Sequence, residues 1–136
     1  MIDYRLVLDV NRLIQTVEAE NGMSDIDKLA RQILYFIADA DTAQRRLTVS
    51  EITMKALFGS VPTVFSRLAK LEASGWIGYQ DDPTDGRIKR VVLTTAARRK
   101  LAGMSSKLHQ KLPGIMSTLP ATATASRGKA ARRKTK

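Results

Sequence analysis

Acidic and basic side chains gather with turn-forming residues in one short stretch, "DDPTDGRIKR" at residues 81–90. Its three carboxylates could form a cation site or a pair of interacting acids; they are Asp81, Asp82 and Asp85. The basic residue that follows, Arg87, could instead bind a phosphate or enter a groove of a nucleic acid. Pro83 and the Asp85-Gly86 pair predict a tight turn between two strand-like runs. In such a turn, shaping the loop is the favoured role of the carboxylates.

The residue types that most catalytic and metal sites need are scarce in this chain. It has no cysteine, which excludes disulfides and thiolate nucleophiles, and its only histidine is His109. A single histidine without cysteine is more consistent with a solvated or interface side chain than with a metal ligand. The sequence also contains no phosphate-binding glycine loop and no Gly-x-Ser-x-Gly motif. We therefore expect no enzyme, no cofactor and no metal site.

Charge is distributed unevenly along the 136 residues, whose formal net charge is +10. Residues 1–41 hold eight acids and four bases, whereas residues 42–119 hold thirteen bases and five acids. Residues 120–136 add six bases and no acid. This distribution predicts that the basic segments face a polyanion and that the acidic segment has another role.

Nothing in the sequence predicts a membrane partner. The longest apolar run, Ile33–Ala38, is far shorter than the roughly 20 residues that span a bilayer. The first residues lack a basic stretch followed by an apolar one, so we expect no signal peptide. The expected location is the cytoplasm.

Apolar residues at helical spacing predict two helices in the acidic segment. The first runs over residues 3–20 and ends at the Asn21-Gly22 pair. The second is expected to begin after Ser24 as its N-cap and to end near Ala40. A polar connector follows.

Two further helices form a helix-turn-helix candidate. Thr48 and Glu51 have the spacing of a capping box and predict a short helix from Val49 to Gly59. Ser60 can cap the next helix, which is expected to run to about Ser74.

The residues that follow the helix-turn-helix candidate predict a hairpin and a last helix. "GWIGYQ" (residues 75–80) and "RIKRVVL" (residues 87–93) are rich in branched and aromatic residues and predict two strands. Thr94 or Thr95 is expected to cap the last helix, which should end at Pro113.

The helix expected at about 60–74 has two contrasting faces. Its apolar face predicts a contact with the core and comprises Val64, Leu68 and Leu71. Its opposite face is small, hydroxylated and basic, with Thr63, Ser66 and Lys70. That composition suits a helix lying in a major groove, although an ordinary solvated helix has a similar face.

The order of elements is that of a winged helix-turn-helix, and two motifs make the resemblance more specific. "RLAKLEASGWI" and "DPTDGRIKRVVLT" resemble the MarR family of bacterial transcriptional regulators, over about residues 25–105. The resemblance implies that Arg87 enters the minor groove from wing 81–90, that Asp85 orients it, and that helix 60–74 lies in the major groove. The other contacts that it implies are Ser60, Thr63, Ser66, Arg67 and Lys70 on the helix, and Lys89 and Arg90 on the wing.

We therefore expect a mainly α fold with a small β-hairpin wing. The winged domain should occupy residues 23–94, flanked by dimerisation helices at 1–22 and 95–119. Residues 120–136 have no large apolar side chain and one sign of charge, which predicts a disordered tail. That tail could be a solubilising end or a clamp for phosphates that is independent of sequence.

The favoured function is a homodimeric regulator of transcription, a repressor that binds double-stranded DNA sequence-specifically and blocks a promoter. One alternative is an architectural or plasmid-maintenance DNA binder of low sequence specificity. Another is a winged-helix adaptor that binds proteins. A small-molecule effector is left open by the sequence.

Overall fold

The computed structural model describes residues 2–54 and 58–117. The expected tail at 120–136 lies outside the described residues, as does part of the helix expected from Val49 to Gly59. The chain divides into two compact units. We name Gly22–Ala102 the winged unit, and Met1–Asn21 together with Gly103–Lys136 the terminal unit.

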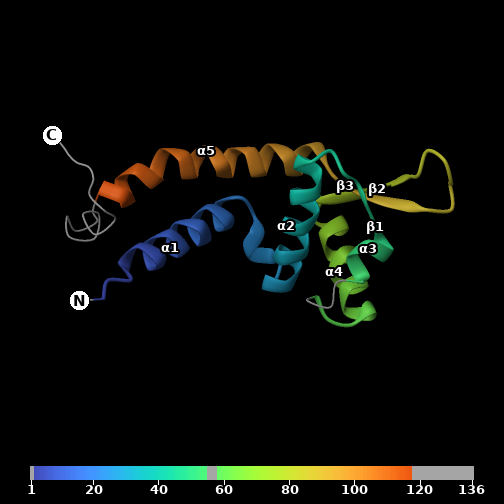
Figure 1. The fold of residues 1–136 in the computed structure, drawn as a ribbon, viewed down its shortest axis with the longest axis horizontal. Helices are drawn as coiled ribbons and strands as arrows, with labels where there is room; N and C mark the ends of the chain where they lie inside the picture. The colour runs from blue at the N-terminus through green and yellow to red at the C-terminus, as the bar shows by residue number, and fades with distance from the viewer. Residues whose placement is uncertain (1, 55–57, 118–136) are drawn as a thin grey trace. The chain divides into compact units, whose positions relative to one another are not determined.

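Helices and a small sheet make up the winged unit (Figure 1). Among its described residues, three α-helices lie wholly inside it: α2 (Lys28–Thr42), α3 (Val49–Thr53) and α4 (Val61–Ala73). The antiparallel sheet has the order β1-β3-β2, with β1 at Leu47–Thr48, β2 at Ile77–Asp81 and β3 at Lys89–Leu93. The prediction of a mainly helical fold with a hairpin wing is confirmed.

The two helices of the helix-turn-helix begin as the sequence predicts. The Thr48 hydroxyl accepts from the Glu51 backbone N–H at 3.1 Å, and the Glu51 carboxylate accepts from the Thr48 N–H at 2.8 Å. The Ser60 hydroxyl accepts from the Thr63 N–H at 3.3 Å and caps α4. Gly59, just before this cap, has a φ of +90°, a conformation that side chains disfavour. Local capping thus determines where both helices start.

The core of the winged unit contains the apolar faces of its helices and one face of the sheet. The face predicted for α4 is confirmed, because Val64, Leu68 and Leu71 are all buried. Trp76, just after α4, is also buried, and the Lys100 ammonium lies 4.9 Å from the centroid of its ring. Other buried members of the core are Ile33, Leu34, Leu47, Ile77 and Val91.

The start of α2 differs from the prediction. Asp27, rather than Ser24, is the N-cap, and its Oδ1 accepts from the Ala30 N–H at 2.9 Å. Ser24 lies in a short 3-10 turn, Met23–Asp25. Ser24 and Asp27 can both cap a helix. Met23 and Ile26 are buried, however, and this burial keeps residues 24–26 outside α2. Packing therefore selects the later cap.

Strand β1 was not predicted from the sequence. Leu47 pairs with Val91 and Thr48 with Arg90, inside the region read as a polar connector and helix cap. A strand of two residues has no alternating pattern to detect. Its pairing depends on β3, which lies more than 40 residues further along the chain.

The last helix, α5 (Thr95–Ser117), begins where predicted but extends further. The Thr94 hydroxyl caps it by accepting from the Ala97 N–H at 3.0 Å. The predicted end at Pro113 is wrong, because this proline lies inside the helix. A proline lacks its own N–H and its ring crowds the carbonyl four residues earlier, but the residues after it can still donate to carbonyls one turn earlier.

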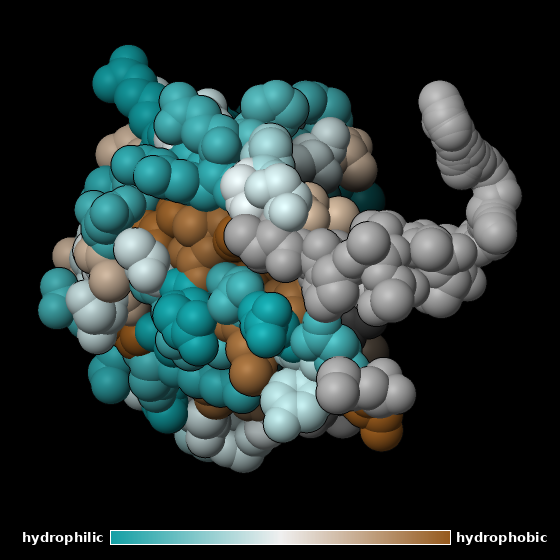
Figure 2. All heavy atoms as spheres, turned by 90° about the vertical axis from the view of Figure 1, so that its left-hand side faces the viewer, coloured by the Kyte–Doolittle hydropathy of each residue, from teal (hydrophilic) through white to brown (hydrophobic). Residues whose placement is uncertain are grey.

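The terminal unit contains α1 (Arg5–Glu20) and the part of α5 from Gly103 onward. The Glu20 carboxylate and the Lys107 ammonium lie 3.9 Å apart and link the two helices. Val17 of α1 is buried, whereas Val7 is 63% and Ile14 38% exposed. Figure 2, seen from the side of the N-terminus, shows apolar surface between polar side chains. Within the described ranges, no helix is both long and apolar enough to cross a membrane.

Candidate nucleic-acid interface

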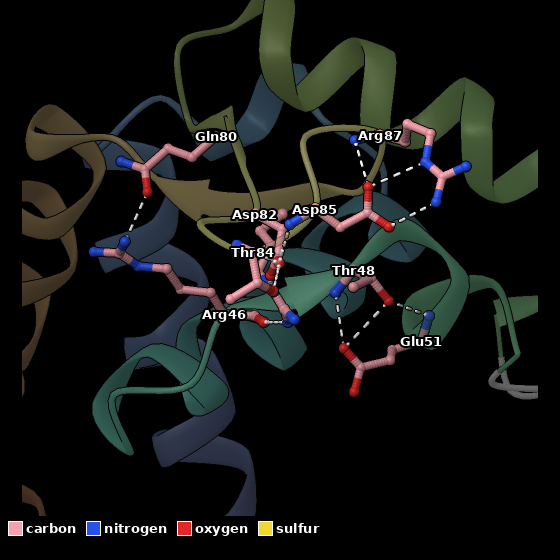
Figure 3. A network of polar contacts seen from close by, with 9 residues as sticks. Arg46, Thr48, Glu51, Gln80, Asp82, Thr84, Asp85 and Arg87 are labelled. Atoms are coloured by element: carbon pink, nitrogen blue, oxygen red, sulfur yellow. Dashed lines mark hydrogen bonds and ion pairs between the residues drawn. The ribbon is translucent and has the colours of Figure 1, made fainter.

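A buried carboxylate organises the wing, the hairpin of β2 and β3 (Figure 3). Asp82 is only 8% exposed, and its Oδ2 accepts from the Thr84 hydroxyl at 2.6 Å and the Thr84 N–H at 3.1 Å. The same oxygen accepts from the Asp85 N–H at 3.1 Å, and Oδ1 accepts from Arg90 Nε at 2.7 Å. The Asp82 N–H donates to the Ile88 carbonyl at 2.9 Å and closes the loop. Asp82 therefore fixes the shape of the wing.

These donors keep the pKa of the Asp82 carboxyl well below its usual range, the Thr84 hydroxyl foremost and the Arg90 guanidinium next. Such a carboxyl adds stability above its unfolded pKa of about 3.9, and that stability is lost as the pH falls below this value. We expect Asp82→Asn to lower the Tm at neutral pH by about 5–10 °C. The difference from wild type should shrink as the pH falls below about 4. Circular dichroism melts over this pH range measure both effects.

Asp39→Asn is the matched control for this prediction. Asp39 lies exposed on α2, and its carboxylate has no ion-pair partner among the residues that the structure describes. Its loss should leave the Tm close to wild type. An equal fall in Tm in both variants would contradict the role given to Asp82. So would a fall in the Tm of Asp82→Asn that persists unchanged in acid.

Arg87 lies at the tip of the wing, with its side chain 91% exposed. Asp85 holds the guanidinium through two contacts, Nε to Oδ1 at 3.1 Å and Nη2 to Oδ2 at 3.3 Å (Figure 3). The Arg87 backbone N–H donates to the same Oδ1 at 3.1 Å. The Arg87 side chain and then its N–H lower the pKa of Asp85, which favours the charged pair. Two parallel contacts fix the plane of the guanidinium while leaving it accessible.

The other two basic residues predicted on the wing stabilise the hairpin itself. Lys89 forms an ion pair with Asp81 on the opposite strand. Arg90 binds Asp82, and its Nη1 also donates to the Arg46 carbonyl at 2.8 Å. A phosphate would have to compete with these acceptors. Phosphate binding by Lys89 and Arg90 stays a prediction, and Arg87 is the better placed ligand.

Four of the five predicted contact residues of α4 fall into two groups. Ser66 and Lys70 are exposed on the face opposite the core. Ser60 and Thr63 meet at the N-terminus of the helix, where their hydroxyl oxygens lie 2.9 Å apart. The four side chains lie along α4; the Ser60 hydroxyl already caps the helix, and the Thr63 hydroxyl is hydrogen-bonded to it.

Arg67 has a structural contact that the sequence did not reveal. Its Nε donates to Asp27 Oδ2 at 2.9 Å, and its side chain is only 25% exposed. This pair links α4 to the start of α2 and contributes to the lowered pKa of Asp27, after the Ala30 N–H. Arg67 therefore positions α4, and its predicted contact with DNA stays a prediction.

Two exposed apolar side chains of α4 were missing from the predicted contacts. Phe65 is 52% and Val61 48% exposed. A helical wheel places Phe65 on a flank and Val61 beside the buried face, so residue type alone suggests burial. Only the packing shows that they reach solvent. They give the outer part of α4 an apolar element beside its hydroxyls and Lys70.

A helix-turn-helix followed by a hairpin with a braced, exposed arginine defines a winged helix-turn-helix protein. A family model described as "MarR family" matches residues 22–88, which include α2, α3, α4 and most of the wing. These residues form a MarR-family winged-helix domain, and the match supports a DNA-binding transcriptional regulator. Regulators of this family are generally not enzymes.

Solved structures share the fold at low sequence identity. A Staphylococcus aureus MepR variant bound to an oligodeoxyribonucleotide is 22% identical, with 93% of this chain and 91% of that chain covered and a TM-score of 0.63. S. aureus MepR bound to ethidium bromide has the same identity and TM-score, with 93% and 89% covered. Apo MarR from E. coli is 24% identical, with 93% and 92% covered and a TM-score of 0.58. No curated protein matches the sequence.

Proposed function

We propose that the protein is a dimeric, sequence-specific repressor whose α4 lies in the major groove while its wing inserts Arg87 into the adjacent minor groove. The observation that carries this proposal is the Asp85–Arg87 pair. An exposed guanidinium held in one plane suits a narrow minor groove, where the negative potential is enhanced. The DNA complex of a MepR variant supports DNA as the partner.

On α4, Ser66 and Lys70 are the leading candidates for DNA contacts, because both are exposed away from the core. Ser60 and Thr63 lie at the N-terminus of the helix, where hydroxyls and backbone N–H groups suit a phosphate. Arg67 would have to share its guanidinium with Asp27. Phe65 adds an apolar contact.

Repression would follow from occupation of a promoter by a homodimer. The dimer contacts are assigned to the helices at 1–22 and 95–119, because α1 exposes apolar side chains in the terminal unit. Two copies of α4 would then meet half-sites about one helical turn apart. The basic residues 120–136 could add phosphate contacts that are independent of sequence.

Selection of binding sites from random duplex DNA with the purified protein tests the proposal. We expect an enriched pseudo-palindrome, and a footprint that covers both half-sites. Equal binding to all duplexes would instead favour an architectural DNA binder. No binding to any duplex would favour a protein adaptor, and either result would overturn sequence-specific repression.

Phe65 is expected to contact thymine methyl groups in the major groove. Phe65→Ala should then weaken binding to the selected site by about 3–10-fold, the scale of one or two buried carbon groups. Deoxyuridine in place of thymidine in the half-sites removes only the methyl groups. It should weaken binding of the wild type and have little effect on Phe65→Ala, as measured by fluorescence anisotropy.

Deoxyuridine placed outside the half-sites is the control, since it should leave both proteins unaffected. If the substitution inside the half-sites weakens the wild type and Phe65→Ala equally, Phe65 does not read the methyl groups.

A further inference from the structure

A polar hollow of about 580 Å³ lies in the winged unit. Its walls come from the end of α2, the connector to β1, α3, β3 and the first turns of α5. Four guanidinium groups and two carboxylates dominate the lining; they belong to Arg45, Arg46, Arg90, Arg98, Asp41 and Glu51. The side chains that line the hollow thus carry an excess of positive charge.

Both carboxylates of the lining are already held by arginines. Arg45 Nη2 lies 2.9 Å from Glu51 Oε2, and Arg98 Nη2 lies 2.8 Å from Asp41 Oδ1. Neither carboxylate is therefore available to neutralise the remaining two guanidinium groups. Arg98 foremost, and Arg46 to a lesser degree, lower the pKa of Asp41, as expected beside a concentration of positive charge.

The remaining two arginines differ in their partners. Arg90 is neutralised by Asp82, which is not part of the lining. Arg46 Nη1 donates to the Gln80 amide oxygen at 2.7 Å (Figure 3), and no carboxylate of the described residues lies within 4.0 Å of it. Arg46 is therefore the positive charge of the hollow that has only a neutral hydrogen-bond partner.

The arginines retain donors for a further acceptor. A guanidinium has five N–H donors, and each of these four uses only one or two of them in side-chain hydrogen bonds. The connector that carries two of them contains Gln44 at a φ of +60°, a backbone conformation uncommon for residues with a side chain. The Gln44 N–H donates to the Asp41 carbonyl at 3.0 Å and the Arg45 N–H to the Ala40 carbonyl at 2.9 Å, so this conformation is the local C-terminal cap of α2.

We propose that the hollow binds a phosphate-type oxyanion, with Arg46 as its principal ligand and the unused N–H groups of Arg90 and Arg98 as further donors. Planar guanidinium groups match the oxygens of such an anion. The phosphate belongs either to a small phosphorylated compound or to the DNA backbone. Binding of a DNA-backbone phosphate rests on the proposed function, whereas binding of a small phosphorylated compound does not.

The first experiment uses the full chain without DNA. Inorganic phosphate is titrated at constant ionic strength, with chloride as the replaced anion, and the arginine Nε–Hε resonances are followed by NMR. We expect saturable shifts at Arg46 and Arg90, binding at least tenfold weaker in Arg46→Gln, and an intermediate affinity in Arg46→Lys. Arg99→Gln, which removes an exposed arginine outside the hollow, should bind like wild type.

The second experiment distinguishes the two sources on the selected DNA site. If the anion is a backbone phosphate, Arg46→Gln should reduce the slope of log K against log salt by about 0.9 relative to Arg99→Gln. An unchanged slope together with saturable phosphate binding assigns the hollow to a small phosphorylated compound. Non-saturable binding and an unchanged slope would together overturn the proposal. If the wild type bound no DNA at all, the proposed function would be overturned, but the result of the phosphate titration would still stand.

Discussion

Arg87→Ala is expected to bind the selected DNA site about 5–150-fold more weakly than wild type, which corresponds to about 1–3 kcal/mol for one good groove contact. The side chain is 91% exposed, and Asp85 is the residue that its guanidinium contacts. Its removal should therefore leave the fold intact and affect DNA binding alone. Fluorescence anisotropy at a fixed salt concentration measures the loss, and an unchanged Tm confirms the fold.

The loss should depend on the base pairs beneath the wing. A narrow A·T-rich minor groove attracts an inserted arginine more strongly than a wider G·C-rich one. Replacing A·T by G·C pairs at those positions should weaken wild type and have little further effect on Arg87→Ala. If both proteins respond equally to the replacement, Arg87 is not the residue that senses the groove.

Asp85 should act through Arg87, as a positioning residue. Asp85→Asn removes the charge that holds the guanidinium in plane, so it should weaken specific binding less than Arg87→Ala does. In the Arg87→Ala background, Asp85→Asn should have no further effect on affinity, which a double-mutant cycle tests. Arg99→Ala is the matched control for loss of an exposed arginine. Additive losses in the cycle would show that Asp85 does not act by orienting Arg87.

Short-range patterns predicted the parts of the fold that depend on neighbouring residues. The Thr48–Glu51 capping box and the Ser60 cap each involve residues three apart, and both form as expected. Asp85 contacts Arg87 two residues away, so the turn sequence alone brings them together. Such contacts need no knowledge of the rest of the fold.

Contacts between distant residues were not predictable in the same way. The family resemblance implies a DNA contact for Arg67, yet Arg67 pairs with Asp27, 40 residues earlier. Arg90 was assigned to phosphate, yet it binds Asp82 and a carbonyl 44 residues earlier. A charged side chain that reaches a partner in another element cannot be distinguished, from its type and spacing, from one that awaits a ligand.

The prediction with the largest expected effect concerns the dimer. Val7 and Ile14 lie two helical turns apart on α1 and are exposed in the terminal unit, so we propose that a second copy covers them. The double variant Val7→Lys, Ile14→Lys would place two charges in that contact, and burying an unpaired charge is strongly unfavourable. We expect mainly monomers at micromolar concentrations, measured by sedimentation velocity.

Loss of the dimer should weaken binding to the two-half-site DNA by about 10²–10⁴-fold, because the second half-site then binds independently of the first. The control is Thr16→Lys, Ala19→Lys, which adds the same charge at exposed positions of α1 that point away from Val7 and Ile14. It should remain dimeric and bind DNA at least as well as wild type. A dimeric Val7, Ile14 variant with wild-type affinity would exclude this face of α1 from the interface. α4 and the wing belong to the winged unit, which the substitutions in α1 do not touch. The monomer should therefore lose affinity for DNA but keep the base preference of one half-site.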